Sequence, residues 1–340
     1  MKQFTLILFL VLNFYAINSF AQDTLVAKDG TVLFGEIKEM DHGTISMETS
    51  FSDDDFTITW LKIHQIISSR SFRFTLADGR RLYGTITKDT TANKLVIVDE
   101  KKGPITIEPN QLVYLKQVDG GSILDVINLS MDFGYSISKA NNLKSLNGSI
   151  KADYIVNAWG LKGFYNVVNS SQDNAERTDR QEGELTAEIF FPMDFYALAS
   201  TNQYANSSQN IMLRSSYSVG LGKYFIHTNR IYFNSDIGMA YTLENYSIDS
   251  ISSRKSVEGK FGLEYNMFDV GDLNLRTKLN LFPSISEPSR LRTVYNFTAK
   301  YDLPRDFYIK GSVDYQYDNM PVEGVAPDDY VYTFGFGWEL

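Results

Sequence analysis

The sequence predicts an all-β protein in which a small all-β domain precedes an antiparallel up-and-down transmembrane β-barrel of about twelve strands. Two patterns carry this prediction. Residues 22–119 contain a tandem repeat of short alternating segments, whereas residues 120–340 contain longer segments in which apolar and polar residues alternate strictly. Such alternation puts apolar side chains on one face of a strand and polar ones on the other. After residue 21 no segment is continuously apolar over the roughly 20 residues of a spanning helix, so any membrane insertion would use strands.

The first residues predict a signal peptide, residues 1–21. Lys2 precedes an apolar run from Phe4 to Ala16, and the small residues Ser19 and Ala21 follow at the spacing of a cleavage site. A permanent N-terminal anchor is the alternative, but the apolar run is shorter than the roughly 20 residues that span a bilayer. Its far flank also lacks stop-transfer charges. We therefore expect an exported protein.

The composition argues against several classes of function. A net charge of -9 gives the chain no electrostatic reason to bind nucleic acid, whose affinity depends on clustered Lys and Arg. The absence of cysteine excludes disulfides, thiolate metal sites, a cysteine nucleophile and a lipid-modified N-terminal cysteine. His42 and His64 have no partners at the fixed spacing of a metal site. We therefore expect no metal and no cofactor.

Residues 22–119 repeat with an offset of 49 residues, which is the separation of Gly30 and Gly79. Asp29 and Asp78 complete an Asp-Gly pair in each copy, a hairpin signal because both turn positions favour positive φ. Further alternating runs bring each copy to about four or five strands, which fits a pair of SH3-like or Sm-like barrels. The domain would either dock a partner or form a structural collar, and the absence of a ligand motif favours the collar.

The last predicted strand shows the barrel pattern best. Its apolar face holds Tyr330, Tyr332, Phe334, Phe336, Trp338 and Leu340. The segments number about twelve, an even number as in bacterial barrels. Compact turns alternate with longer loops, and loops 169–181, 245–254 and 318–329 all fall on one side of the up-and-down scheme. Because such barrels have their short turns in the periplasm, we expect the N-terminal domain and the C-terminus there.

The polar face of the barrel would line its lumen. A set of soluble β-sandwiches is the alternative, but no spare layer is evident to cover each apolar face. The candidate lumen-lining residues carry charges of both signs, and they include Asp132, Lys151, Glu184, Arg214, Lys260, Arg276, Lys278, Arg292 and Lys310.

Two resemblances support an outer-membrane barrel. The C-terminal residues Thr333, Gly335, Trp338 and Leu340 resemble the assembly signal of outer-membrane proteins, although Leu340 stands where that signal usually has Phe. This resemblance implies the barrel-assembly machinery as a partner during biogenesis. From about residue 123 to 340 the chain is similar to the family of salt-induced outer-membrane proteins of unknown function, through LNGSIKADYIVNAWGLKGFYNVV and SSYSVGLGKYF. That family implies a fold and a location, but no active residues.

Three functions remain open. In a narrow pore the lumen charges would filter small polar solutes, whereas in a structural or envelope-stress barrel they would pair and close the interior. In the second case the periplasmic domain would bind a partner. An outer-membrane hydrolase is a distant third, because the only histidine of the barrel half, His227, is predicted in a periplasmic turn. We therefore predict a non-enzymatic barrel in contact with outer-membrane lipid.

Overall fold

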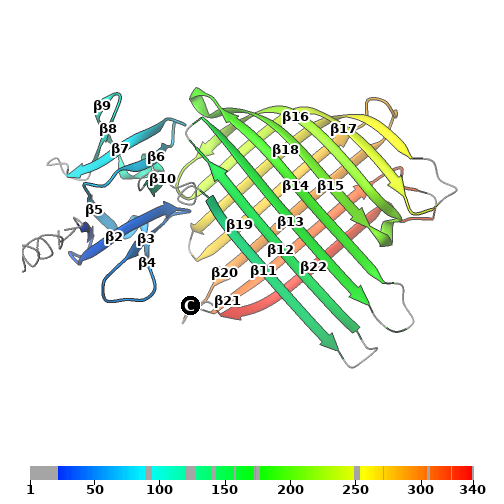
Figure 1. Ribbon diagram of the computed structural model, residues 1–340, viewed down its shortest axis with the longest axis horizontal. Helices are drawn as coiled ribbons and strands as arrows, with labels where there is room; N and C mark the ends of the chain where they lie inside the picture. Colours follow the sequence, from blue (N-terminus) through cyan, green and yellow to red (C-terminus); the bar gives the residue numbers. More distant parts are fainter. Residues whose placement is uncertain are drawn as a thin grey trace, which may run out of the picture.

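The computed structural model describes residues 22–88, 94–118, 127–138, 143–156, 158–171, 173, 177–248, 253–270, 272–304, 307–322 and 324–338. They form two antiparallel β-sheets, one on each side of residue 120 (Figure 1). The signal peptide predicted at residues 1–21 lies outside these residues. None of the helices that can be described is both long and apolar enough to cross a membrane.

The first sheet contains two copies of one arrangement. The first copy comprises β1 (Asp23–Ala27), β2 (Val32–Asp41), β3 (Thr44–Glu48), β4 (Phe56–Thr59), the 3-10 helix η1 (Trp60–Lys62) and β5 (Ile63–Ile67). The second comprises β6 (Phe72–Leu76), β7 (Arg81–Lys88), β8 (Leu95–Asp99), β9 (Gly103–Ile107), η2 (Pro109–Gln111) and β10 (Leu112–Gln117). In each copy the first strand pairs with the second and the last, and the second, third and fourth strands form a meander.

The two copies interlock around a single core. Strand β10 of the second copy pairs with β2 of the first, and β5 lies against β7 in the reciprocal position. The indole nitrogen of Trp60 donates a hydrogen bond of 2.9 Å to the carbonyl oxygen of Pro109, the residue at the equivalent position of the other copy. Buried residues of both copies, Leu25 and Phe74 among them, belong to one hydrophobic cluster. The likeness of each copy to an SH3-like or Sm-like barrel stays a prediction.

The second sheet contains twelve strands in sequence order among the described residues. They are β11 (Ile127–Ser138), β12 (Leu143–Ile155), β13 (Trp159–Ser171), β14 (Thr178–Phe190), β15 (Phe195–Asn206), β16 (Ile211–His227), β17 (Ile231–Tyr246), β18 (Arg254–Val270), β19 (Leu273–Pro283), β20 (Leu291–Asp302), β21 (Phe307–Asp318) and β22 (Asp328–Trp338). This confirms the predicted antiparallel up-and-down order. No pairing between β11 and β22 is present among the described residues, so closure of the barrel stays a prediction.

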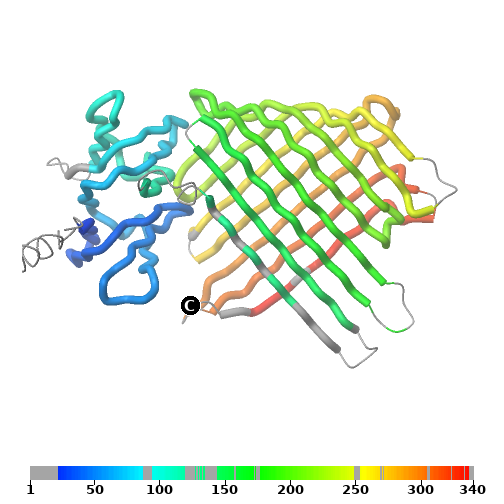
Figure 2. The backbone as a smooth tube through the Cα atoms, in the orientation of Figure 1, coloured from blue at the N-terminus to red at the C-terminus, as the bar shows by residue number. Residues whose placement is uncertain are grey.

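The second sheet curls around an interior. The strands of its front and back walls slope in opposite directions in Figures 1 and 2. The Lys278 ammonium on β19 lies 3.7 Å from a carboxylate oxygen of Glu184 on β14. The Asn206 amide on β15 donates a hydrogen bond of 3.2 Å to Asp329 on β22. A flat sheet would hold β14 and β19 about 24 Å apart, so these contacts require a curled sheet.

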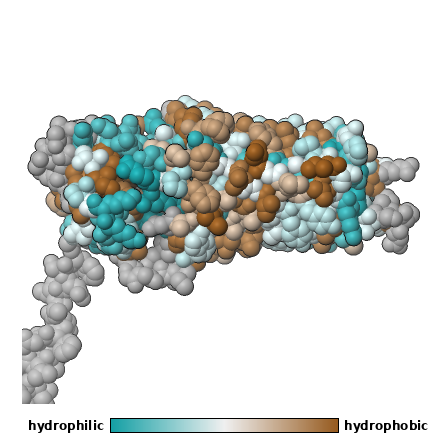
Figure 3. Space-filling model, turned by 90° about the horizontal axis from the view of Figure 1, so that it is seen from above, coloured by the Kyte–Doolittle hydropathy of each residue, from teal (hydrophilic) through white to brown (hydrophobic). Residues whose placement is uncertain are grey.

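The curled sheet is apolar outside and polar inside. Phe133 and Phe334 are 78% and 80% exposed on its outer surface, where Figure 3 shows many hydrophobic side chains. By contrast, charged residues such as Glu244, Glu258 and Arg290 are among its most buried side chains. This distribution is the reverse of a water-soluble core and follows from the strict alternation along the strands.

The two ends of the curled sheet differ. The strand pairs with short connections, β12–β13, β14–β15, β16–β17, β18–β19 and β20–β21, have their connected ends at the end of the curled sheet that faces the N-terminal sheet, here called the near end (Figure 1). The strand ends that the other connections join, those of β11–β12, β13–β14, β15–β16, β17–β18, β19–β20 and β21–β22, lie at the opposite, far end. The long loops expected on one side therefore share the far end, away from the N-terminal domain.

Candidate functional site

The interior of the curled sheet contains a cavity of about 810 Å³. Its lining includes seven of the nine charged candidates: Lys151, Glu184, Arg214, Lys260, Arg276, Lys278 and Arg292. Lys310 lies on β21 opposite Gly335 and is exposed, but it is not part of that lining. The side chain of Asp132 is outside the described part of the chain. The same holds for the side chains of Thr333, Trp338 and Leu340 in the predicted assembly signal.

Toward the far end, charged side chains fill the interior by pairing with one another. Arg290 is 2% exposed, and its guanidinium contacts Glu244 at 2.8 Å, Glu287 at 2.9 Å and Asp318 at 2.6 Å. The Nε of Arg292 donates a hydrogen bond of 2.8 Å to Glu258, which also accepts one of 2.9 Å from Thr242. Buried charges require such pairing because their desolvation is costly. Arg292 is therefore engaged in a closed network.

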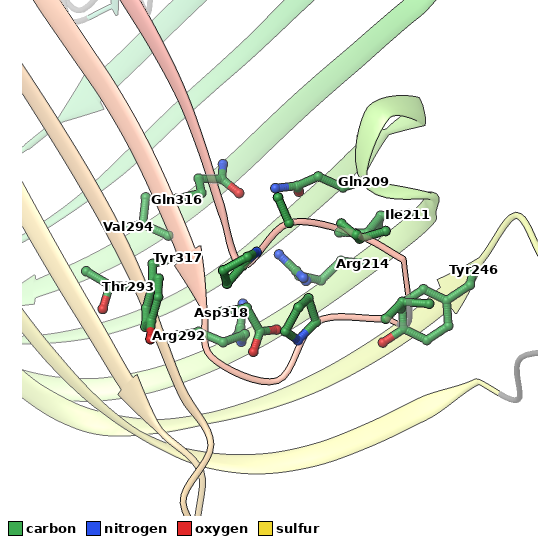
Figure 4. Close-up of a pocket in the computed structure, with 15 residues that line it drawn as sticks. Gln209, Ile211, Arg214, Tyr246, Arg292, Thr293, Val294, Gln316, Tyr317 and Asp318 are labelled. Atoms are coloured by element: carbon green, nitrogen blue, oxygen red, sulfur yellow. The ribbon is translucent and has the colours of Figure 1, made fainter. Parts of the chain in front are cut away.

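The described residues of the connection between β21 and β22 line a pocket at the far end (Figure 4). Its residues Pro321, Val322, Val325, Ala326 and Pro327 line a small cavity of about 30 Å³ together with Ile211, Arg214 and Tyr246. These apolar groups lie beside Arg292, and the larger interior cavity also extends into the far half, where Arg180, Tyr204 and Arg292 are part of its lining.

The second copy of the N-terminal repeat covers the opening of the curled sheet at the near end, here called the near mouth. A guanidinium nitrogen of Arg81 donates a hydrogen bond of 2.9 Å to the carbonyl oxygen of Val156, and the same group lies 3.5 Å from the centre of the Phe190 ring. Arg73 donates another hydrogen bond to the carbonyl oxygen of Ile155. The carbonyl oxygens at this end of β12 therefore find partners on the N-terminal domain.

Gly79 allows the second copy of the repeat to approach the curled sheet closely. Gly79 has a φ of +77° in the turn between β6 and β7, and a Cβ there would lie 2.6 Å from a carboxylate oxygen of Asp194. A second turn of the domain also approaches the sheet, since a Cβ on Gly43 would lie 3.2 Å from the carbonyl oxygen of Asn229. The Asp-Gly pair that predicted a hairpin is thus also a docking point.

Between the domain and the sheet lies a second cavity of about 420 Å³, here called the near chamber. Asp41 and His42 extend from the end of β2 into it. Burial raises the pKa of Asp41 to about 7. Burial, together with the nearby cations Arg276 and Lys151, lowers the pKa of His42 to about 4. Both groups are therefore largely uncharged at a pH between these two values.

Aromatic rings form a continuous row along one wall of the near chamber. The His42 and Phe268 ring centres are 4.0 Å apart, and Phe268 contacts Tyr232 at 5.3 Å. Tyr232 then contacts His227 at 5.3 Å, which stacks on Tyr224 at 4.7 Å.

His227 is the last residue of β16, at the near end and next to the turn in which it was predicted. Its Nδ1 is 2.8 Å from a carboxylate oxygen of Asp194, so it is held by a carboxylate. No group of three or more potential metal-ligating His, Cys, Asp or Glu side chains occurs in the part of the chain that the structure describes.

Sequence reasoning missed the near-end contacts of Asp41, Arg73 and Arg81. Their role depends on how the two sheets meet, which no local pattern reveals. One signal was available: at the position of Arg81 in the second copy, the first copy has Val32. When equivalent strand positions carry arginine in only one copy, that face of the copy is expected to contact another part of the protein.

Comparison with known proteins gives a family and a fold likeness. The family described as "Protein of unknown function, DUF481" matches residues 131–339. No curated protein matches this chain. A solved structure titled "NanC porin structure in rhombohedral crystal form" is similar at 13% sequence identity and a TM-score of 0.38, covering 63% of this chain and 98% of that chain.

Proposed function

The chain belongs to the DUF481 family of proteins of unknown function, and we propose that it is an outer-membrane β-barrel forming a narrow pore for small polar solutes. The observation that carries the proposal is the inverted sheet, which is apolar outside and encloses a polar cavity. The resemblance of residues 123–340 to salt-induced outer-membrane proteins supports the same location.

The outer surface of the sheet supports membrane insertion. Leu221 on β16 and Ile237 on β17 are more than half exposed and lie directly opposite each other. Soluble monomers rarely expose large contiguous apolar patches, whereas a lipid-facing band consists of them. In this proposal the sheet closes into a barrel in the outer membrane, and the barrel-assembly machinery inserts it. The N-terminal domain and the C-terminus then lie in the periplasm.

The interior supports solute passage more strongly at the near end than at the far end. Arg276 faces both the central cavity and the near chamber. Among the described residues no carboxylate forms an ion pair with it, so its charge is free to act on a solute. The near mouth, however, is covered by Arg73 and Arg81. The proposed pore is therefore closed in this arrangement, and the N-terminal domain acts as its periplasmic cover. We assign it no catalytic step.

Planar-bilayer conductance of the full-length protein tests the proposal. We expect low conductance for the unchanged chain and higher conductance for Arg73→Ala/Arg81→Ala, which removes the contacts at the near mouth. Thr24→Ala/Val32→Ala, at the equivalent positions of the first copy, is the matched control and should not change conductance. Adding Arg276→Glu to the open variant should shift ion selectivity toward cations.

A structural or envelope-stress barrel whose periplasmic domain binds a partner is the second candidate function. The closed network of Arg290 and Arg292 and the covered near mouth favour it. A folded, heat-resistant barrel that stays silent in the bilayer, even as Arg73→Ala/Arg81→Ala, would support this candidate and contradict the pore.

A further inference from the structure

The near chamber combines two features of a small-molecule site. Its volume of about 420 Å³ falls within the range of about 300 to 1,000 Å³ that is usual for ligand pockets. One wall carries the ring row of Tyr224, His227, Tyr232, Phe268 and His42. Aromatic walls favour ligands that present a ring of their own, because ring pairs attract beyond the area they bury.

The charges of the chamber leave one cation available to a ligand. Three of its ammonium groups are paired, Lys162 with Glu188 at 2.8 Å, Lys151 with Asp153 at 3.1 Å and Lys278 with Glu184 at 3.7 Å. Two of its guanidinium groups, on Arg73 and Arg81, hold backbone carbonyl oxygens of β12 and of the turn after it.

The remaining cation of the chamber is Arg276. Its guanidinium lies 5.9 Å from the centre of the Phe268 ring. Among the residues that the structure describes, its guanidinium forms no ion pair or hydrogen bond, and its charge acts on the nearby His42 ring, whose pKa it lowers. Its side chain is exposed within the interior. The two carboxylates without a cation in the chamber are already engaged, since Glu264 accepts a hydrogen bond of 2.7 Å from Asn266 and Asp41 one of 3.5 Å from Tyr232.

We propose that the near chamber binds small planar ring carboxylates, with the ring against Tyr224, His227 and Tyr232 and the carboxylate on the Arg276 guanidinium. Guanidinium and carboxylate groups match each other in a bidentate geometry. Phe268 contacts both Tyr232 and Arg276, so a ring beside Tyr232 has its substituent within reach of that cation. The proposal names a solute class for the pore proposed above and depends on that pore for a route into the chamber.

The ring signals of the three histidines report whether a ligand binds in the near chamber. The chain has three histidines, of which His42 and His227 line the near chamber, whereas His64 is exposed on β5. With ¹⁵N-labelled histidine in the full chain folded in detergent, benzoate at constant pH should shift the ring signals of His42 and His227 saturably. The His64 signal should stay in place. Empty micelles serve as the control for partition of benzoate into detergent.

Two arginine variants test whether the Arg276 guanidinium binds the carboxylate of the ligand. Arg276→Gln should weaken benzoate binding about tenfold to a hundredfold, the usual effect of losing a charge-assisted hydrogen bond. Arg180→Gln is the matched control, because Arg180 also lies over a ring, that of Tyr204 at 5.6 Å, but outside the near chamber. It should bind benzoate like the unchanged chain. Retained heat-modifiable gel mobility shows that each variant is folded.

Three carboxylates with the same charge as benzoate test whether the ligand needs a planar ring. Acetate, which has no ring, and cyclohexanecarboxylate and glucuronate, whose rings are not planar, should each bind at least about tenfold more weakly than benzoate. Equal binding of any of them would overturn the planar-ring class. Equal shifts of all three histidines, or unchanged affinity in Arg276→Gln, would overturn the site. Benzoate binding without conductance would support this inference and contradict the pore, and conductance without benzoate binding would do the reverse.

Discussion

The two copies of the N-terminal repeat share one backbone arrangement but present different surfaces. In the second copy the outward face of β10, β6 and β7 carries Arg73 and Arg81 and covers the near end of the curled sheet. In the first copy the equivalent face of β5, β1 and β2 carries Thr24 and Val32, and Phe34 beside them is 55% exposed. The comparison teaches that the inward positions maintain the fold in both copies, whereas the outward face carries docking contacts only in the second copy. The first copy contacts the curled sheet through its β2–β3 turn, at Asp41 and His42.

The largest expected effect tests the hydrophobic core that the two copies share. Phe74 and Leu25 are equivalent positions, both fully buried in the common core. Phe74→Ala and Leu25→Ala should each lower the free energy of unfolding of the N-terminal domain, by about 3–5 and 2–5 kcal/mol respectively, because each leaves a cavity. Urea unfolding followed by the emission of the buried Trp60 measures this. If either variant unfolded in two separate transitions, the two copies would have independent cores.

The next largest effect tests the docking contacts that only the second copy makes through its outward face. Arg81→Ala removes a hydrogen bond to a backbone carbonyl and a cation–π contact, so docking should weaken by about 2–3 kcal/mol. Val32→Ala, at the equivalent position of the first copy, should leave docking unchanged. The chain has no cysteine, so spin labels on cysteines introduced at Glu100 and Ser208 report only on this geometry. The distance distribution between them should broaden in Arg81→Ala alone. Equal broadening in both variants would show that the outward face of the first copy also contributes to docking.

A smaller effect separates turn strain from docking. Gly30 and Gly79 both have positive φ, so replacement by Ala should strain either turn by about 1–2 kcal/mol. Only Gly79→Ala should also broaden the spin-label distances, because its Cβ would meet Asp194, whereas nothing lies within 4 Å at Gly30. The thermal midpoint of the domain measures the strain common to both variants. A Gly30→Ala variant that undocks would contradict the comparison.

The smallest effect is a pH dependence confined to the docked surface. The pKa of Asp41 is raised from 3.8 to about 7, so the stability linked to its burial is present below about pH 4 and lost as the pH rises through 7. The pKa of His42 is lowered from 6.5 to about 4, so its contribution is present above about pH 6.5 and lost as the pH falls through 4. In the unchanged chain the two contributions oppose each other.

Two variants separate these contributions. In His42→Gln the thermal midpoint of the N-terminal domain should decrease as the pH rises from 4 to 7, because the Asp41 contribution is then no longer opposed by that of His42. In Asp41→Asn it should rise between pH 4 and 6.5, because only His42 remains. Slopes of the same sign in both variants would show that one of these groups is not buried at the interface.

The strands could be predicted from the sequence because their signals are local. The alternation at Tyr332, Phe334 and Phe336 marks a strand and its outward face without knowledge of any other segment. The same holds for the Asp-Gly turn at Gly79. Antiparallel order then followed from the alternation of short and long connections.

The candidate site could be predicted only in part. Local alternation placed Arg292 and Arg276 on the same polar face, but it could not distinguish their surroundings. Arg292 meets Glu258 across an intervening strand, whereas Arg276 meets no carboxylate among the described residues. That difference depends on the curvature of the sheet and on which side chains meet in the interior. For the same reason the contacts of Arg73 and Arg81 could not be inferred before the two sheets were placed together.

If the chain is exported as proposed, the pairing of β10 with β2 has a consequence for the order of events during export. Leu115 on β10 lies opposite Met40 on β2, and β10 also pairs with β6, so this strand completes both copies at once. A chain that has crossed the inner membrane only as far as β9 would therefore present an open core and unpaired strand edges to periplasmic chaperones. In that proposal, once Gln117 emerges the domain could finish folding in water before the strands of the second sheet begin to leave the translocon.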